Sequence, residues 1–259
     1  MSSIIILLHL LSFAIDSTGT GFKNLANGVE YRSFKLSSYS EYEGEIHIVR
    51  INPNKVKPEV FTSKEHKLKP MTAKEWLEKF NLNIVINLGM YHKDFSTHVG
   101  YLKNGDNINN PKFNEYKSAL LFNPSEKNLP YAIIIDLDNP NEKEMVNKYK
   151  TIVQNLRLIK GKGVNVWKKT GSLWPEAGIA SDTNGNLLIF FTTTPVIMFE
   201  LNEILLKLPL NIVKAFHTDG GPPASLSLHF KDFSLDLSGN TVSGEQEPIP
   251  NILGFRINN

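Results

Sequence analysis

Short apolar runs rich in β-branched and aromatic residues recur along this chain, separated by Gly, Pro or Asn. Such runs favour β-strands, because branched side chains pack well on a pleated surface and the separating residues form turns. Helical periodicity is confined to a few short segments. We therefore expect a strand-rich fold. The predicted strands span residues 29–36, 45–51, 59–62, 83–87, 100–103, 118–122, 132–137, 151–159, 187–193 and 212–216.

Three segments, residues 70–80, 142–150 and 199–208, predict helices. In the first, Thr72 and Glu75 have the spacing of a capping box. Strands and helices intermix without a repeat, a low-complexity tract or a linker, and the Gly- and Lys-rich stretch after residue 159 is typical of a surface loop. We predict an α/β (mixed α+β) fold: a single domain over residues 20–259, with a mixed, strand-rich twisted sheet and flanking helices.

The first residues predict an export signal rather than part of the fold. Residues 4–15 form one apolar run, broken only by His9 and Ser12. A membrane-spanning helix needs about 20 apolar residues, whereas the core of a secretory signal needs about 7–15. Ser17 and Gly19 suit cleavage before residue 20. The positively charged segment that usually precedes the apolar core of a secretory signal is missing here. A buried N-terminal strand is therefore the alternative to a signal peptide. We expect residues 1–19 to be a signal peptide and the mature protein to be periplasmic or secreted, with no stable membrane span.

Composition excludes several classes of function. Lys plus Arg number 28 and Asp plus Glu 26, so the net charge of +2 gives no footprint for nucleic-acid binding. The chain has no cysteine, which excludes disulfides, thiolate metal sites and a Cys nucleophile. The serine-hydrolase elbow, the phosphate loop and the zinc-protease motif are all absent. His92 and His98 are the only histidines close in sequence, and we predict no metal site.

Two predicted strands end in side chains suited to binding. One runs into Asn87, which offers a donor and an acceptor, and Gly89, which lets a ligand approach the backbone. In the other, alternation places Asn155 and Arg157 on one face. An Arg on an apolar strand needs a partner, and its planar fork suits phosphate. A structural carboxylate could equally be that partner, and the segment alone leaves both readings open.

A third strand end carries acid–base groups. If the strand continues, His217 and Asp219 point the same way, and two glycines follow them. Asp219 could be a catalytic carboxylate or a turn residue that binds its own backbone. Elsewhere Glu176 lies two residues after Trp174. A desolvated Glu can act as a general acid, and a Trp face can stack on a sugar, although a core Trp beside a surface Glu is the alternative.

Six short motifs occur in an order that resembles the phosphodiester glycosidase family, whose eukaryotic member removes N-acetylglucosamine from a mannose 6-phosphate diester. The resemblance extends from about residue 28 to the C-terminus. The motifs are NLGMY (87–91), THVGY (97–101), QNLRLI (154–159), WPEA (174–177), DTNGNLLIFF (182–191) and HTDGG (217–221).

The resemblance implies a hydrolase that cleaves a sugar-1-phosphodiester, similar to a GlcNAc-1-phosphodiester, at the glycosidic bond on an envelope or extracellular glycan. This chain departs from the family pattern at three positions. Leu88 replaces a small residue, Pro175 stands where Ser is common, and His217 replaces an Asn. Leu88 could narrow the pocket, so the departures bear on activity rather than on fold.

Glycosidic cleavage passes through an oxocarbenium-like state that two carboxyl groups commonly assist. We predict Asp219 as nucleophile or base and Glu176 as the second carboxylate. Arg157 would hold the phosphate, with His217 and Asn155. No cofactor is required, although groups near Asp219 could hold Ca²⁺ or Mg²⁺. The predicted substrate-binding residues are Asn87, Gly89, Tyr91, His98, Asn155, Trp174, Gly220 and Gly221.

Two other readings remain. The same cleft could belong to a non-catalytic polysaccharide-binding protein or an accessory protein of exopolysaccharide biosynthesis, which Leu88 favours slightly. The joint presence of Asp219, Arg157 and Glu176 favours an enzyme. A serine hydrolase that uses Ser225 with His217 and Asp219 is disfavoured, because the last two are only two residues apart and no elbow presents the serine.

Overall fold

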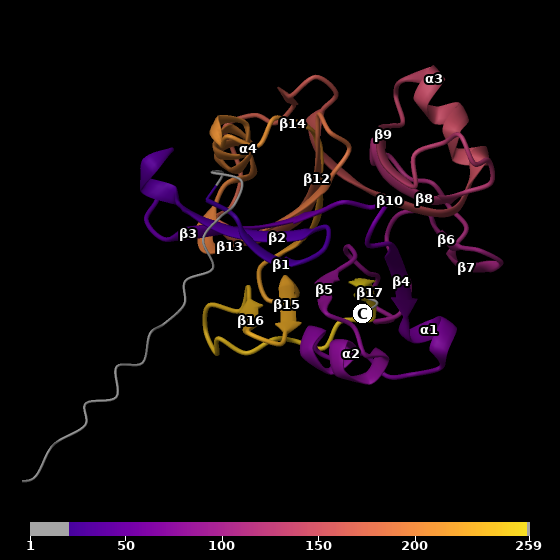
Figure 1. The fold of residues 1–259 in the computed structure, drawn as a ribbon, viewed down its shortest axis with the longest axis horizontal. Helices are drawn as coiled ribbons and strands as arrows, with labels where there is room; N and C mark the ends of the chain where they lie inside the picture. Colours follow the sequence, from indigo (N-terminus) through magenta and orange to yellow (C-terminus); the bar gives the residue numbers. More distant parts are fainter. Residues whose placement is uncertain (1–20, 258–259) are drawn as a thin grey trace, which may run out of the picture.

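The computed structural model describes residues 21–257, so the predicted signal peptide lies outside the described residues. The apolar runs form two sheets, flanked by a few helices, and the predicted strand-rich mixed class is confirmed (Figure 1). The sheet prediction is refined in one respect: the strands divide between two sheets whose pairs are antiparallel. Sequence patterns give strand positions but not strand direction, which tertiary pairing decides.

The larger sheet has the strand order β1-β2-β3-β13-β12-β14-β10-β6-β7, and β8, β9 and β11 join it through β10. Its centre is the set β12, β14 and β10, where the segment around Asn155 and Arg157 of β10 lies beside the end of β14. Its strands are β1 (Lys23–Ala26), β2 (Val29–Lys35), β3 (Glu45–Ile51), β6 (Leu102–Asn104), β7 (Asn107–Asn110), β8 (Ser118–Pro124), β9 (Ala132–Asp136), β10 (Tyr149–Lys160), β11 (Val164–Asn165), β12 (Trp174–Asp182), β13 (Leu187–Val196) and β14 (Ile212–Gly220).

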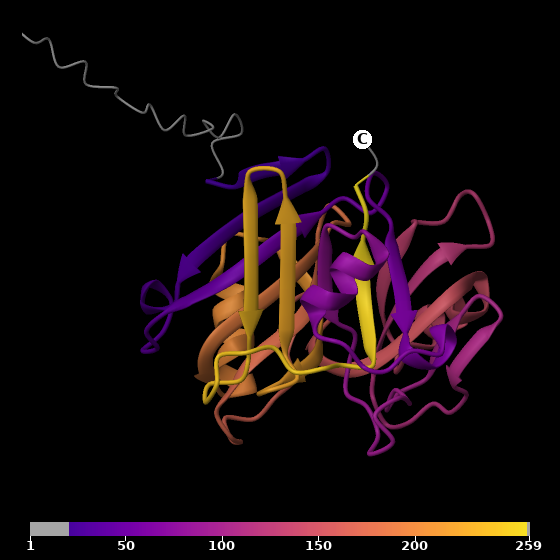
Figure 2. The ribbon, with the colours of Figure 1, turned by 90° about the horizontal axis from the view of Figure 1, so that it is seen from below.

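The smaller sheet has the strand order β16-β15-β5-β17-β4. Its members come from both halves of the chain, and the C-terminal strand pairs between two N-terminal ones (Figure 2). The third strand end of interest, that of β5, therefore belongs to a different sheet from the other two. These strands are β4 (Pro58–Thr62), β5 (Ile84–Asn87), β15 (Ser225–Phe230), β16 (Phe233–Ser238) and β17 (Asn251–Phe255).

The sheets pack face to face, and alternation along β13 shows how the core forms. Ile189 and Phe191 point into the core between the sheets, whereas Leu188 and Phe190 point to the opposite face. All four are fully buried. Burial on both faces explains why this strand reads as a continuous apolar run rather than an alternating one. It also makes the central strands a rigid support for side chains at their ends.

Helices cover the outer faces of both sheets. Helix α4 (Met198–Lys207) packs on the larger sheet through Leu201, Ile204 and Leu205. Helix α2 (Ala73–Phe80) packs on the smaller sheet and begins at the predicted capping box. The remaining helical turns are α1 (Ser63–His66), η1 (Leu36–Ser38), α3 (Pro140–Lys143) and η2 (Glu144–Lys148), of which the last two lie near β8 and β9 (Figure 1).

Two local differences from the sequence prediction matter for the site. The strand predicted to end at residue 216 continues as β14 to Gly220, because β12 supplies backbone partners as far as Gly220 and β10 as far as His217. The helix predicted over residues 142–150 is instead α3 followed by the 3-10 turn η2, and its last two positions begin β10. Tyr149 is buried in the sheet, so tertiary packing overrides the helical pattern there.

Candidate active site

The candidate site forms where β14 lies between β12 and β10. The register pairs His217 with Leu156 of β10, and it pairs Asp219 with Ala177 of β12. Glu176 of β12 lies opposite Gly220. A register shift at this point, between Ala177 and the next residue, shows that β14 bulges here. Bulges re-aim side chains, and they commonly occur beside active sites.

His217 and Glu176 form a buried ion pair. Their Nε2 and Oε2 atoms are 2.5 Å apart, and the side chains are only 4% and 1% exposed. Burial alone would lower the pKa of His217, but the hydrogen bond and charge of Glu176, together with Asp219, outweigh it and raise the pKa. Glu176 therefore favours the protonated form of the buried His217 ring.

Asp219 is half-buried at the end of β14. Burial raises its pKa to about 6, and the charge of Glu176 adds to this effect, whereas His217 and a hydrogen bond from the Gly220 amide oppose it. That amide donates to Asp219 Oδ1 at 2.9 Å. A carboxyl with a pKa near neutrality can exist in either protonation state at physiological pH, which suits it to acid–base or nucleophilic work.

Asn87 joins the two sheets beneath the site. Its Nδ2 donates to the Thr218 hydroxyl at 3.2 Å, and its Oδ1 accepts from the Ser225 amide at 3.1 Å. Both side-chain groups are used, and the side chain is buried. Thr218 belongs to the HTDGG motif, but the sequence predicted no role for it. Asn87 thus links the side chain of Thr218, the residue before Asp219, to the first residue of β15.

The loop after β5 packs so tightly that only glycine fits at residue 89. A Cβ there would lie 2.4 Å from both Asn155 Oδ1 and His98 Cε1. Asn155 donates to the Leu88 carbonyl at 2.8 Å, which ties the loop to β10. Leu88 itself is fully buried in the core between the sheets. The position where a small residue is usual therefore contributes to the core of this protein.

His98 supports this loop from below. Its ring is fully buried, and Nε2 contacts the Gln154 carbonyl at 2.9 Å. Burial lowers the pKa of His98 to about 4, so the ring is neutral near pH 7 and Nε2 carries the donated proton. Its predicted contact with substrate stays a prediction.

Trp174 and Tyr91 are the aromatic candidates of the site, and both are at least partly exposed. Trp174 is 51% exposed, and its ring would lie 3.1 Å from a Cβ added to Gly221, whose φ is +64°. Glycine is required there both for its backbone and for the approach of the indole. Burial and the charges of Asp219 and Glu247 raise the pKa of Tyr91 to about 12, which keeps its hydroxyl protonated. Both rings are available for a sugar face.

Arg157 lies on the same strand face as Asn155 but is bound by two carboxylates. Its Nη1 lies 2.7 Å from Asp138 Oδ1 and 3.4 Å from Asp136 Oδ1. Asp136 is buried, and its other oxygen accepts from the Gly161 amide. The structural partner that the sequence left open therefore exists, and the ion pairs compensate the guanidinium charge. Its assignment to substrate phosphate stays a prediction.

The remaining candidates are also placed. The Pro175 carbonyl accepts from the Gly221 amide at 2.8 Å, so this family departure keeps a backbone contact beside the site. Ser225 is buried, and its hydroxyl donates to the Pro223 carbonyl. Within residues 21–257 no group of three or more His, Asp or Glu is arranged to hold a metal ion. The possible Ca²⁺ or Mg²⁺ near Asp219 stays a prediction.

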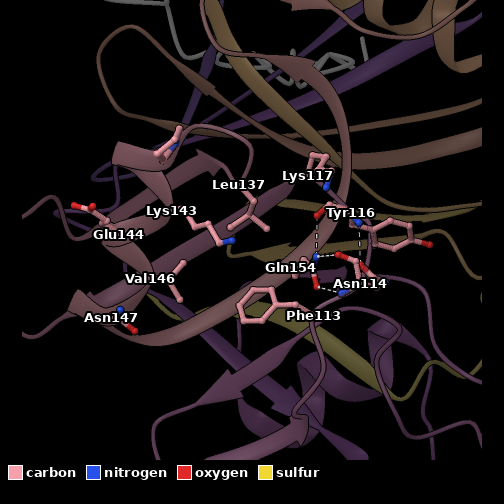
Figure 3. Close-up of a pocket in the computed structure, with 11 residues that line it drawn as sticks. Phe113, Asn114, Tyr116, Lys117, Leu137, Lys143, Glu144, Val146, Asn147 and Gln154 are labelled. Atoms are coloured by element: carbon pink, nitrogen blue, oxygen red, sulfur yellow. Dashed lines mark hydrogen bonds between the residues drawn. The ribbon is translucent and has the colours of Figure 1, made fainter.

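A pocket of about 550 Å³ lies beside the site, over β10 and next to α3 and η2 (Figure 3). Tyr116 and Gln154 belong to its wall; Gln154 opens the QNLRLI motif but had no predicted role, and Tyr116 carried no signal in the sequence. Burial and the charges of Glu115 and Asp219 raise the pKa of Tyr116, which places its hydroxyl within the field of the candidate carboxyl. The pocket is therefore a neighbour of the site.

Comparisons with known proteins identify the family of this chain. The model of the phosphodiester glycosidase family matches residues 80–256, which include every candidate site residue. Search of the curated proteins gave no match. No helix within the described residues is long and apolar enough to cross a membrane.

Two solved structures share the fold. The catalytic domain of zebrafish N-acetylglucosamine-1-phosphodiester alpha-N-acetylglucosaminidase, auto-inhibited by its pro-peptide, superposes with a TM-score of 0.62 at 13% identity, covering 93% of this chain and 85% of that one. A hypothetical protein from Synechocystis gives a TM-score of 0.62 at 14% identity, covering 92% of this chain and 63% of that one. At these identities the likeness shows the fold alone.

Proposed function

This chain belongs to the phosphodiester glycosidase family, and on that premise we propose that it hydrolyses a GlcNAc-1-phosphodiester at the glycosidic bond. Water adds to the anomeric carbon, the bond from that carbon to the phosphate oxygen breaks, and a free sugar and a phosphomonoester leave. The observation that carries the proposal is the placement on β14 of a half-buried carboxyl, Asp219, two residues after a buried histidine, His217, that Glu176 holds; the pKa values of Asp219 and His217 are both raised.

We assign the sugar to Asp219. Positive charge develops at the anomeric centre in the transition state, and an ionised carboxylate stabilises it either as a nucleophile or through its field. With a pKa of about 6, Asp219 is mostly ionised at pH 7. The Gly220 amide holds one of its oxygens, which limits the rotation of the side chain. Trp174 provides an exposed ring on which the sugar could stack.

We assign the leaving phosphate to His217. Phosphate leaves as a weak base, so a cation that holds its charge matters more than a strong general acid. The imidazolium of His217 supplies that charge, and its Nδ1 makes no hydrogen bond within the described residues. Glu176 acts through His217: it is 1% exposed and bound to Nε2, so we assign it a positioning role. This proposal revises its predicted role as a second carboxylate at the sugar.

The setting is an envelope or extracellular glycan, which rests on the predicted export signal and on the glycan substrates of the family. Fractionation of expressing cells tests this part. Recovery of the shortened chain outside the cytoplasm supports export, whereas full-length cytoplasmic protein contradicts it. A non-catalytic polysaccharide binder remains the rival, and no contact in the site favours it over hydrolysis.

The direct test uses the methyl phosphodiester of α-GlcNAc-1-phosphate. We expect release of free GlcNAc and methyl phosphate by the wild type, measured by anion-exchange chromatography. Release of GlcNAc-1-phosphate would instead indicate cleavage of the phosphate ester and would contradict glycosidic chemistry. Glycan retention without any free sugar would support the binding protein. The exposed Asp106→Asn variant is the matched control for Asp219→Asn, because both remove one carboxylate.

A further inference from the structure

The pocket beside the site has a composition that the proposed reaction does not use. Apolar side chains of Phe113, Leu137 and Val146 form much of its wall, and the amino group of Lys143 extends into it (Figure 3). Lys117 also lines it, with Glu144 as its one acidic residue. A cavity of about 550 Å³ matches the size of small-molecule sites. Its lining suits an apolar body that carries a negative charge.

Gln154 holds the wall between this pocket and the active site. Its Oε1 accepts from the Tyr101 and Asn114 amides, and its Nε2 donates to the Asn114 and Tyr116 carbonyls. These hydrogen bonds hold residues 114–116 in place. The Gln154 amide is therefore used within the wall and does not face a ligand. The next residue of β10, Asn155, binds the loop after β5. One stretch of strand thus supports the pocket and the site together.

Tyr116 lines the pocket and also contacts the loop after β5, which belongs to the candidate site. In Figure 3 its ring points away from the pocket, and its hydroxyl contacts Met90 Sδ at 3.9 Å. Met90 follows Gly89 in the loop beside the candidate carboxyl, and the charge of Asp219 acts on the same hydroxyl. Tyr116 therefore lies between the pocket that it lines and the loop after β5 that its hydroxyl contacts. A substrate cleaved at Asp219 could extend past Tyr116 into the pocket.

We propose that this pocket binds the aglycone of the phosphodiester, the group beyond the phosphate, and that it selects an apolar body bearing an acidic substituent. This inference rests on the proposed function, because it needs a diester whose sugar lies at Asp219. The apolar wall supplies affinity through burial of the aglycone body. Lys143 supplies the preference for a negative group, since it is the charged side chain that enters the pocket.

Filling the pocket tests its role. Asn147 is exposed and lines the pocket, whereas its neighbour Lys148 is exposed and does not. We expect Asn147→Trp to lower kcat/KM about tenfold for the 4′-carboxybiphenyl phosphodiester of GlcNAc and to leave the methyl diester unchanged. The matched control Lys148→Trp should change neither. Equal loss on both diesters, or loss on neither, would overturn the inference.

The charge preference has a separate test. We expect Lys143→Met to lower kcat/KM for the carboxybiphenyl diester severalfold while the uncharged biphenyl diester is unaffected, because only the former loses an ion pair. Lys148→Met is the matched control. An equal effect on both biphenyl substrates would show that Lys143 contributes packing alone and would contradict the preference for an acidic group.

Failure of the proposed function can be told apart from failure of this inference. The product 4′-carboxybiphenyl phosphate can be titrated into the wild type and into Asn147→Trp by calorimetry, without any turnover. Binding to the wild type that the substitution weakens supports the pocket even if no diester is cleaved. An absence of binding at millimolar concentration overturns the inference, even if the methyl diester is cleaved as proposed.

Discussion

Two clusters of charged side chains on neighbouring strands of the larger sheet differ in how their charges are balanced. The β10 cluster consists of Arg157 with Asp136 and Asp138, and its guanidinium is paired twice. The β14 cluster consists of His217, Glu176 and Asp219, in which one imidazolium serves two carboxyl groups. The first holds permanent charge in a compensated network, whereas the second includes a histidine and a carboxyl whose pKa values are both raised.

The difference separates a structural role from a catalytic one. The guanidinium of Arg157 stays protonated at all ordinary pH values. Loss of one of its carboxylate partners should therefore change the stability of the fold rather than a titration. His217 can neutralise, and its pKa depends on Glu176 and Asp219. Perturbed titration near neutral pH in a partly open position marks functional sites, although structural networks also perturb pKa values. The following substitutions test which cluster carries the chemistry.

The largest effect is expected at Asp219. Asp219→Asn keeps the shape of the side chain but removes the charge that faces the sugar, so kcat on the methyl diester should fall roughly 10³-fold or more. Initial rates of GlcNAc release measure this, and Asp106→Asn should retain wild-type rates. If Asp219→Asn keeps a substantial fraction of the activity, the β14 cluster is not the catalytic one.

The same variant should be more stable at neutral pH. The pKa of Asp219 in the fold is about 6, above its usual 3.8, so the ionised form is disfavoured by folding. Below pH 4 the carboxyl is neutral in both states and costs nothing. Between pH 4 and 6 the penalty grows, and above pH 6 it stays constant at about 1–3 kcal/mol. Urea unfolding of both proteins across this range should therefore diverge as pH rises.

Arg157→Ala should act mainly on stability. The substitution leaves the buried Asp136 without its cation, and we expect the free energy of unfolding to fall by about 2–3 kcal/mol. At a temperature where the variant is folded, turnover should change less than about threefold, because the catalytic groups lie in the β14 cluster rather than the β10 cluster. Lys74→Ala, which breaks an exposed pair with Asp236, is the control and should cost under about 1 kcal/mol. Lost turnover with unchanged stability would restore Arg157 as the phosphate ligand.

Glu176→Gln should change the pH profile of turnover. The wild-type profile should be bell-shaped, because Asp219 must ionise on the acid side and His217 must keep its proton on the alkaline side. Glu176 raises the pKa of His217, and Glu176→Gln removes the negative charge that does so. The alkaline limb should therefore move to lower pH, and the rate at pH 7 should fall about tenfold. An alkaline limb that does not move would show that Glu176 does not act through His217.

The sequence predicted most strands and the capping box of α2, because these depend on local patterns that are read within a few residues. It also brought Asn87, Glu176 and Asp219 into one hypothesis, through motifs rather than geometry. It could not show that Glu176 binds His217, because that contact depends on the register of β12 and β14. Tyr116 was missed for the same reason, since a tyrosine before a strand carries no local signal.

The Arg157 ambiguity has a similar cause. Alternation places the side chain on a face of β10 but says nothing of what faces it. Asp136 and Asp138 lie about twenty positions earlier, at the end of β9, which reaches β10 only through β8. Long-range pairing of this kind is set by the whole fold, so the two carboxylate partners of Arg157 could not be identified from the sequence.

The smallest effect is expected at Trp174, which tests whether the open side of the β14 cluster faces the sugar. Loss of its half-exposed ring in Trp174→Ala should raise KM for the methyl diester about threefold to tenfold with little change in kcat, because stacking on a sugar face contributes on the order of 1 kcal/mol. Leu173→Ala, at an adjacent residue that is 53% exposed, should leave KM unchanged. A fall in kcat without a change in KM would indicate that Trp174 instead holds Gly221 and the end of β14 in place, since the indole packs against that glycine.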